Sequence, residues 1–175
     1  MTIRHLKLAE AADGVAEEDQ RTTAIVQDML QDIRSRGEDA VRMYAEKFDN
    51  WSGDFVLSEE KLATLIESVP QSVKDDIDFA HRQIRRFAEA QRDSLTSFEI
   101  ETEPGVVLGQ RVLPIDAAGC YVPGGRYAHA ASALMSVATA KAAGVKHITA
   151  CSPPRGDSIN PAVAYAMHVA GADRI

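Results

Sequence analysis

The final third of the sequence alternates between short apolar runs and helical patterns, and this alternation limits the possible fold more than any other feature. Strand-like runs at 118–122 and 146–151 are each followed by a turn and then by helical spacing, at 130–143 and 161–169. A third strand-like run, DRI, begins at 173–175. This β-α-β-α-β order is typical of a parallel sheet with right-handed helical crossovers. The sequence therefore predicts an α/β fold, and because the third run has only begun at the last residue, we expect a longer protein.

The region before this pattern is predicted to be helical. Apolar residues recur at helical spacing over 17–36, and a second apolar stripe follows directly. Ser58 stands before two acidic residues and can cap a third helix. The longest helix is expected over 72–95, where apolar residues line one side. Its length indicates an arm or a bundle member rather than a crossover helix.

A hairpin is predicted between the helices and the sheet. Apolar and acidic residues alternate from residue 98, which indicates an exposed strand, and the Pro104-Gly105 turn leads into a second predicted strand over 106–115. We therefore expect three parts: an N-terminal helical region at 1–96, a β-hairpin connection at 97–116, and the first part of an α/β domain at 117–175 that is apparently truncated.

Net charge restricts the partners of the chain. The formal charge is −7, so the chain would repel nucleic acid and anionic membranes, and neither is expected as a partner. Four arginines gather in the predicted long helix, namely Arg82, Arg85, Arg86 and Arg92. Acidic residues are interleaved with them. This mixture favours a solvated helix face over an anion-binding patch.

Composition indicates an ordinary globular protein in a reducing compartment. Apolar residues make up 45% and charged residues 26% of 175 residues, enough for one buried domain with a helical extension. No run of about 18 apolar residues is present to span a bilayer. Cys120 and Cys151 are the only cysteines and lack the spacing of a disulfide framework or zinc knuckle. We expect a cytoplasmic protein.

The turn after the first apolar run is the best candidate for a binding site. Ligands of open α/β sheets bind at the carboxyl ends of the strands, where Pro123, Gly124 and Gly125 stand. Glycine lets a backbone or a ligand come close. The turn matches neither the P-loop nor the GxGxxG pattern, because Gly125 and Arg126 follow where the P-loop needs Lys and Ser or Thr. A structural turn and a ligand-binding turn both stay open on these grounds.

Single reactive residues give weaker predictions. The five histidines have no i, i+3 or i, i+4 spacing, which argues against a zinc site within the chain. His129 is the best placed of them for a ligand, but an exposed polar residue in the first turn of a helix is the better explanation. Cys120 is better explained as a small buried hydrophobe than as a nucleophile, and Cys151 as structural.

Several longer stretches resemble the histidinol dehydrogenase family. They are GCYVPGGRYAHAASALMSVATAKAAGVKHI, the following CSPP, the final GADRI, and the earlier IRSRGEDAVRMYAEKFD. The resemblance covers nearly the whole chain. It implies a fold of N-terminal helices followed by an incomplete Rossmann-like parallel sheet with crossover helices.

The resemblance also implies an activity. Members of the family are zinc-dependent, homodimeric oxidoreductases that use NAD twice to oxidise a small primary alcohol through an aldehyde to a carboxylate, as from L-histidinol to L-histidine in histidine biosynthesis. The tyrosine of their YVPGG turn contacts NAD, and this implies cofactor binding by Tyr121, Pro123, Gly124 and Gly125. The zinc ligands and the acid/base pair belong to the C-terminal half of the family, so no catalytic or metal-binding residue is expected in this chain.

Three alternatives stay open. Arg126-Tyr127 after the glycines, together with CSPP after the next strand, resembles a branch of the same family that oxidises sulfopropanediol. A chain that truly ends at Ile175 would be a non-catalytic module for nucleotide binding or assembly. An unrelated α/β binding protein would keep Tyr121 and the glycine turn away from any cleft.

Overall fold

The computed structural model describes residues 13–124 and 127–175, and the chain divides into two compact units, Met1–Ser52 and Gly53–Ile175. In the first unit, helices α1 (Asp13–Arg36) and α2 (Glu38–Asp49) pack against each other. Gly37 joins them with a φ of 60°, a conformation that glycine adopts without strain. The phenol of Tyr44 on α2 donates a hydrogen bond of 3.1 Å to Asp32 on α1.

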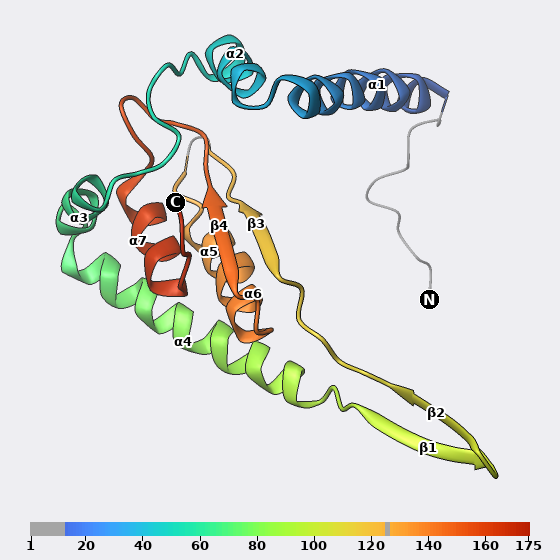
Figure 1. Cartoon of the computed structure of the whole chain (residues 1–175). Coiled ribbons are helices and arrows are strands. Elements are labelled where there is room, and N and C mark those ends of the chain that lie inside the picture. The colour runs from blue at the N-terminus through green and yellow to red at the C-terminus, as the bar shows by residue number, and fades with distance from the viewer. Residues whose placement is uncertain (1–12, 125–126) are drawn as a thin grey trace, which may run out of the picture. The chain divides into compact units, whose positions relative to one another are not determined.

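The second unit contains the sheets and the remaining helices (Figure 1). Its elements in chain order are α3 (Glu59–Glu67), α4 (Gln71–Asp93), β1 (Phe98–Glu103), β2 (Val106–Gln110), β3 (Ala117–Tyr121), α5 (Ala130–Ala133), η1 (Leu134–Ala138), α6 (Thr139–Ala142), β4 (His147–Cys151) and α7 (Pro161–Ala170). The order after residue 116 is the predicted alternation of strand and helix. The fold is that of an α/β Rossmann-like fragment preceded by helices.

The strands β3 and β4 form the predicted parallel sheet. Ala117 pairs with His147 at one end of the ladder and Tyr121 with Cys151 at the other. Arg174 then bridges Thr149 in parallel, where the sequence predicts a third strand to begin. The sheet is therefore built by two successive crossovers.

The core lies between the sheet and its crossover helices. Its largest fully buried side chains come from both layers: Val122, Leu134, Val137, Ile148 and Met167. Each such side chain stabilises the fold by about 1.5–3 kcal/mol through removal of apolar surface from water. The long helix α4 packs against α6, η1 and α7 and adds Ile77 to this cluster. Figure 1 shows α4 running beside these helices.

The crossover helix between β3 and β4 contains an irregularity that the sequence pattern does not predict. Its middle five residues, Leu134–Ala138, form a π-helical turn. The Ser136 hydroxyl donates to the carbonyl oxygens of Ser132 at 2.9 Å and Ala133 at 3.3 Å. A serine that binds the preceding turn competes with the backbone N–H groups for those carbonyls, which widens the helix locally.

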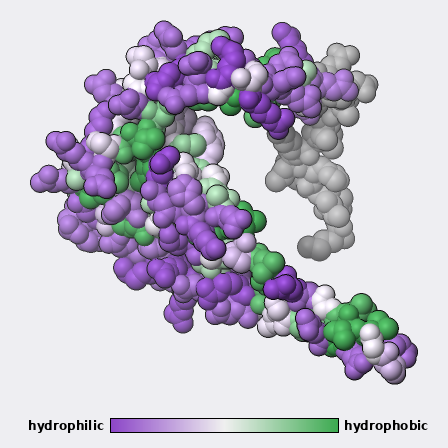
Figure 2. Space-filling view, viewed as in Figure 1, coloured by the Kyte–Doolittle hydropathy of each residue, from purple (hydrophilic) through white to green (hydrophobic). Residues whose placement is uncertain are grey.

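The hairpin of β1 and β2 is shorter than expected. The ladder ends where Phe98 pairs with Gln110, so the predicted strand beyond Gln110 is wrong. β2 ends there because its partner strand β1 begins at Phe98, so residues after Gln110 have no strand to pair with. The N–H of Val112 donates to the Ser97 hydroxyl instead. Both strands are exposed along their length, as predicted for the first, and Figure 2 shows an apolar patch over the hairpin.

Two helix starts follow from capping side chains. Ser58 accepts a hydrogen bond of 3.2 Å from the N–H of Lys61, which confirms the predicted cap of α3. Asn160 caps α7, which begins with Pro161. Gly144 and Gly171 have positive φ values after α6 and α7, where a left-handed residue ends a helix most easily.

Candidate functional site

The carboxyl ends of β3 and β4 lie next to each other because the two strands are parallel and in register. The pairing continues one residue past β3, since the N–H of Val122 donates to the carbonyl of Cys151 at 2.8 Å. The loop that follows each strand therefore leaves the sheet at the same edge. In α/β sheets, this edge is where ligands bind.

The two loops enclose a pocket of about 190 Å³. It is lined by residues from both loops and from the start of α7: Pro123, Gly124, Tyr127, Ser152, Pro153, Pro154, Arg155, Asn160 and Val163. Sites for whole small molecules usually occupy roughly 300–1,000 Å³. The pocket can therefore hold one group of a larger ligand, such as a phosphate or a sugar, but not a complete dinucleotide.

Gly124 is the point at which the two loops come together. A Cβ atom on Gly124 would lie 3.1 Å from Cβ, 3.2 Å from Cγ and 3.3 Å from Cδ of Pro153. A side chain at this position would be tightly packed against the rigid proline ring, which would have to shift by a few tenths of an ångström. The close approach of Pro153 explains why glycine stands at residue 124. Gly124 and Pro153 also form part of the pocket wall.

The start of α7 is closed to a ligand. The Oδ1 atom of Asn160 accepts hydrogen bonds from the N–H groups of Ala162 at 3.0 Å and Val163 at 3.4 Å. Pro161 has no N–H group to offer. The free amides that bind anions at many helix N-termini are therefore already used or missing at this helix.

Arg155 supplies the positive charge of the pocket. Its backbone N–H donates to the Ser158 carbonyl, which holds the loop after β4 in a turn. Its guanidinium forms no ion pair with any described residue, not even with Asp157 in the same loop. No carboxylate lines the pocket in the part of the chain that the structure describes. The site is therefore suited to a neutral or negatively charged group.

The described residues that the family resemblance implies lie at this edge, but not all of them line the pocket. Pro123 and Gly124 do, whereas Gly125 lies outside the described residues. Tyr121 is the last residue of β3 and is 64% exposed. Side chains alternate along a strand, so Tyr121 faces away from the helix-covered side on which Cys120 is buried. Its ring is open to solvent beside the carboxyl end of the sheet.

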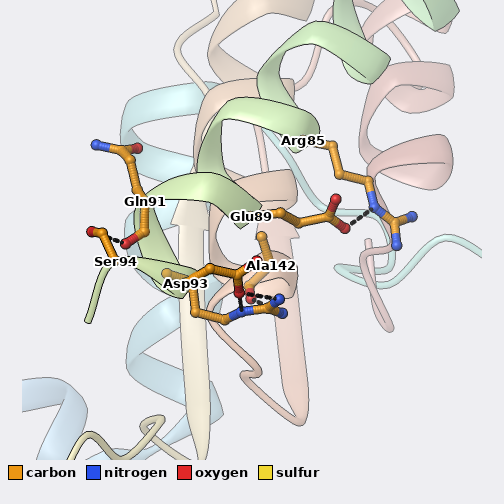
Figure 3. Close-up of polar contacts among 7 residues, drawn as sticks. Arg85, Glu89, Gln91, Asp93, Ser94 and Ala142 are labelled. Carbon is orange, nitrogen blue, oxygen red and sulfur yellow. Dashed lines mark hydrogen bonds and ion pairs between the residues drawn. The ribbon is translucent and has the colours of Figure 1, made fainter. Parts of the chain in front are cut away.

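Two of the four arginines of α4 are paired with acids of the same helix. Arg85 pairs with Glu89 at 2.8 Å (Figure 3). Arg92 binds Asp93 through two nitrogens at 2.9 and 2.7 Å. Arg92 also donates to the carbonyl of Ala142 at 3.2 Å, which ties α4 to the end of α6. For Arg85 and Arg92, these contacts agree with the predicted helix face on which acids neutralise the arginines.

The other candidate residues carry no chemistry that the geometry supports. Desolvation, and then the neighbouring Cys120, raise the pKa of the Cys151 thiol, so it stays protonated at neutral pH. His129 precedes α5 and its side chain makes no capping hydrogen bond. Within 13–124 and 127–175, no three or more His, Cys, Asp or Glu side chains gather in a way that could hold a metal ion. No helix there is long and apolar enough to cross a membrane.

Comparison with known proteins decides the family. The histidinol dehydrogenase family matches residues 14–175, which is nearly the whole chain. The chain belongs to this family. A crystal structure of histidinol dehydrogenase from Elizabethkingia anophelis is similar to 97% of the chain, with a TM-score of 0.77 and 29% identity, and the chain covers 37% of it.

Relatives of known name within the histidinol dehydrogenase family include two from Ruegeria pomeroyi. The chain is 50% identical to its sulfopropanediol 3-dehydrogenase and 53% identical to a histidinol dehydrogenase homolog, over all of this chain and 40% of each relative. It is 39% identical to a histidinol dehydrogenase of Methanosarcina barkeri over 86% of the chain and 35% of that protein. The chain thus spans about two fifths of the length of the curated relatives that it matches.

Sequence reasoning alone missed the second loop of the pocket. Ser152, Arg155 and Asn160 stand in the loop SPPRGDSIN, which the pattern marks only as a connection. A usable signal was present, because this loop follows a predicted parallel strand just as the glycine turn does. Arg155 is also its only basic residue.

Proposed function

We propose that this chain is the N-terminal, cofactor-facing part of a dehydrogenase that uses NAD and zinc to oxidise a polar primary alcohol through an aldehyde to a carboxylate. The family match over 14–175 carries this proposal. The pocket at the carboxyl ends of β3 and β4 supports it, because it lies where α/β sheets hold cofactors. Tyr121, Pro123, Gly124 and Gly125 are the proposed cofactor-binding residues.

The described residues fit part of NAD. The pocket has room for one group of the dinucleotide, and no carboxylate lines it among the described residues to repel the pyrophosphate. Gly124 lets the backbone approach closely, since it has no side chain. The exposed ring of Tyr121 offers an apolar face and a hydroxyl donor at the same edge of the sheet.

The described residues do not fit zinc, since they include no cluster of suitable ligands. Zinc is therefore proposed to be held by polypeptide other than this chain, and the catalytic acid and base likewise. When bound, NAD accepts a hydride from the substrate carbon. The role of this chain is to bind and orient the dinucleotide through its two loops, with the crossover helices keeping these loops in place.

Similarity favours a sulfonated diol as the substrate. The chain is 50% identical to a sulfopropanediol 3-dehydrogenase and 39% identical to a histidinol dehydrogenase. We therefore propose sulfopropanediol as the first candidate substrate. L-histidinol, with a role in histidine biosynthesis, is the second candidate.

The proposal includes a homodimer in the cytoplasm. Large apolar side chains are exposed on the second unit, among them Phe87, Leu95, Leu113, Ile115 and Met135. Leu95, Leu113, Ile115 and Met135 line one hollow of the surface, and an exposed apolar surface of this kind supports burial against further polypeptide. Both cysteines are free, which is compatible with a reducing compartment.

Two measurements test the function. Calorimetric titration of NAD into the purified 175-residue chain is expected to show binding, and its absence at millimolar NAD would contradict the proposal. The second measurement is the rate of NADH formation by the polypeptide of the complete reading frame. The assay contains NAD, zinc and either sulfopropanediol or histidinol. Binding without any NADH formation would identify a non-catalytic nucleotide-binding module instead.

A further inference from the structure

The pocket at the ends of β3 and β4 presents hydrogen-bond donors to whatever enters it. Asn160 uses its side-chain oxygen to cap α7, which leaves its Nδ2 amino group as a donor. The Arg155 guanidinium has five N–H donors and no acceptor. The hydroxyls of Ser152 and Tyr127 can donate as well. None of these donors binds another described residue, so they stay available to a ligand.

The charge of the pocket selects the class of ligand. Arg155 is its only cationic lining residue among those described, and no lining residue is acidic. The pocket thus offers hydrogen-bond donors and one positive charge. A group that accepts several hydrogen bonds and carries negative charge is complementary to both. A phosphate meets this requirement, and a pocket of about 190 Å³ limits the ligand to a group of that order rather than a whole nucleotide.

The usual source of positive potential for a phosphate is missing at α7. Phosphates in α/β folds commonly bind the free N–H groups of a helix N-terminus. Here Asn160 occupies the N–H groups of Ala162 and Val163, and Pro161 has none. The attraction for an anion must therefore come from a side chain, and Arg155 is the charged one that lines the pocket.

We propose that the pocket is a phosphate site in which Arg155 binds a phosphate of the nucleotide, with Asn160 Nδ2 and the Ser152 hydroxyl as further donors. A guanidinium suits this task because its planar fork matches two phosphate oxygens at once. The identity of the nucleotide as NAD rests on the proposed function. The preference for a phosphate rests on the pocket alone.

The test compares binding of NAD and of inorganic pyrophosphate to the full 175-residue chain by calorimetry. Arg155→Gln is expected to weaken both ligands about tenfold, the loss of one good charge-assisted contact. Arg155→Lys is expected to recover part of the loss, since it restores charge without the fork. Arg111→Gln is the matched control, because Arg111 is also exposed but lies outside the pocket, and it should change neither affinity. Circular dichroism verifies that each variant is folded.

The outcomes separate this inference from the proposed function. Loss of both affinities in Arg155→Gln supports the phosphate site. Unchanged NAD binding in Arg155→Gln overturns the site but leaves the proposed function intact. Arg155-dependent binding of pyrophosphate without binding of NAD supports the site and contradicts the proposed function. Binding of neither ligand to the wild-type chain overturns both.

Discussion

Replacement of Gly124 by alanine should push apart the two loops that form the pocket. The added Cβ would lie 3.1–3.3 Å from three ring atoms of Pro153, closer than ordinary van der Waals contact. The proline ring cannot rotate away, so Pro153 and its backbone would have to shift by a few tenths of an ångström. Gly119 in the middle of β3 gives a matched control, because a Cβ there meets nothing within 4 Å.

Two opposing effects set the size of the change. Alanine in place of glycine stabilises by about 0.4–1 kcal/mol through lower entropy of the unfolded chain, where the native backbone permits it. Overpacking costs about 1–3 kcal/mol. Gly119→Ala should therefore be neutral or slightly stabilising, whereas Gly124→Ala should be destabilising by up to about 2 kcal/mol. The difference between the two variants isolates the clash with Pro153, because the entropy gain is common to both.

Urea unfolding followed by circular dichroism measures this difference. NAD titration of the same variants then reports on the pocket, and Gly124→Ala should bind NAD more weakly than Gly119→Ala. Equal stability and equal affinity of the two variants would refute the reasoning. That result would mean that the loops accept a side chain at residue 124, so their close approach would not shape the pocket.

Three further predictions concern the contacts that hold the pocket and the sheet. Asn160→Ala should destabilise by about 1 kcal/mol in urea unfolding through loss of the α7 cap, whereas Asn160→Asp keeps the cap and should be close to wild type. Tyr165→Phe removes the hydrogen bond of 2.9 Å to Asp78 that joins α7 to α4, and should cost about 1 kcal/mol in the same assay. The N–H of Ile148 holds the pKa of Asp173 below its usual value, so Asp173 stabilises the fold above the unfolded-state pKa of about 4 and this contribution disappears as pH falls through the folded pKa. The stability difference between wild type and Asp173→Asn should accordingly shrink on acidification, and a constant difference across that pH range would contradict it.

Local patterns predicted most of the second unit because they act through near neighbours in the chain. The Ser58 cap and the end of helical spacing near residue 143 depend on groups within a few residues, so they are visible in the sequence. The end of β2 at Gln110 is not visible in the sequence, because it depends on where the partner strand β1 begins. The π turn over Leu134–Ala138 was also missed, since its spacing of apolar residues is compatible with a regular helix.

The sequence by itself determined the order of strands and helices, the class of fold and, through its resemblance, the family. It also placed the glycine turn at the end of a strand. Only the tertiary structure decided what stands opposite that turn, because the register of β3 against β4 brings Pro153 against Gly124 and Arg155 into the same pocket. Residues so far apart along the chain meet through strand pairing, which local spacing does not encode.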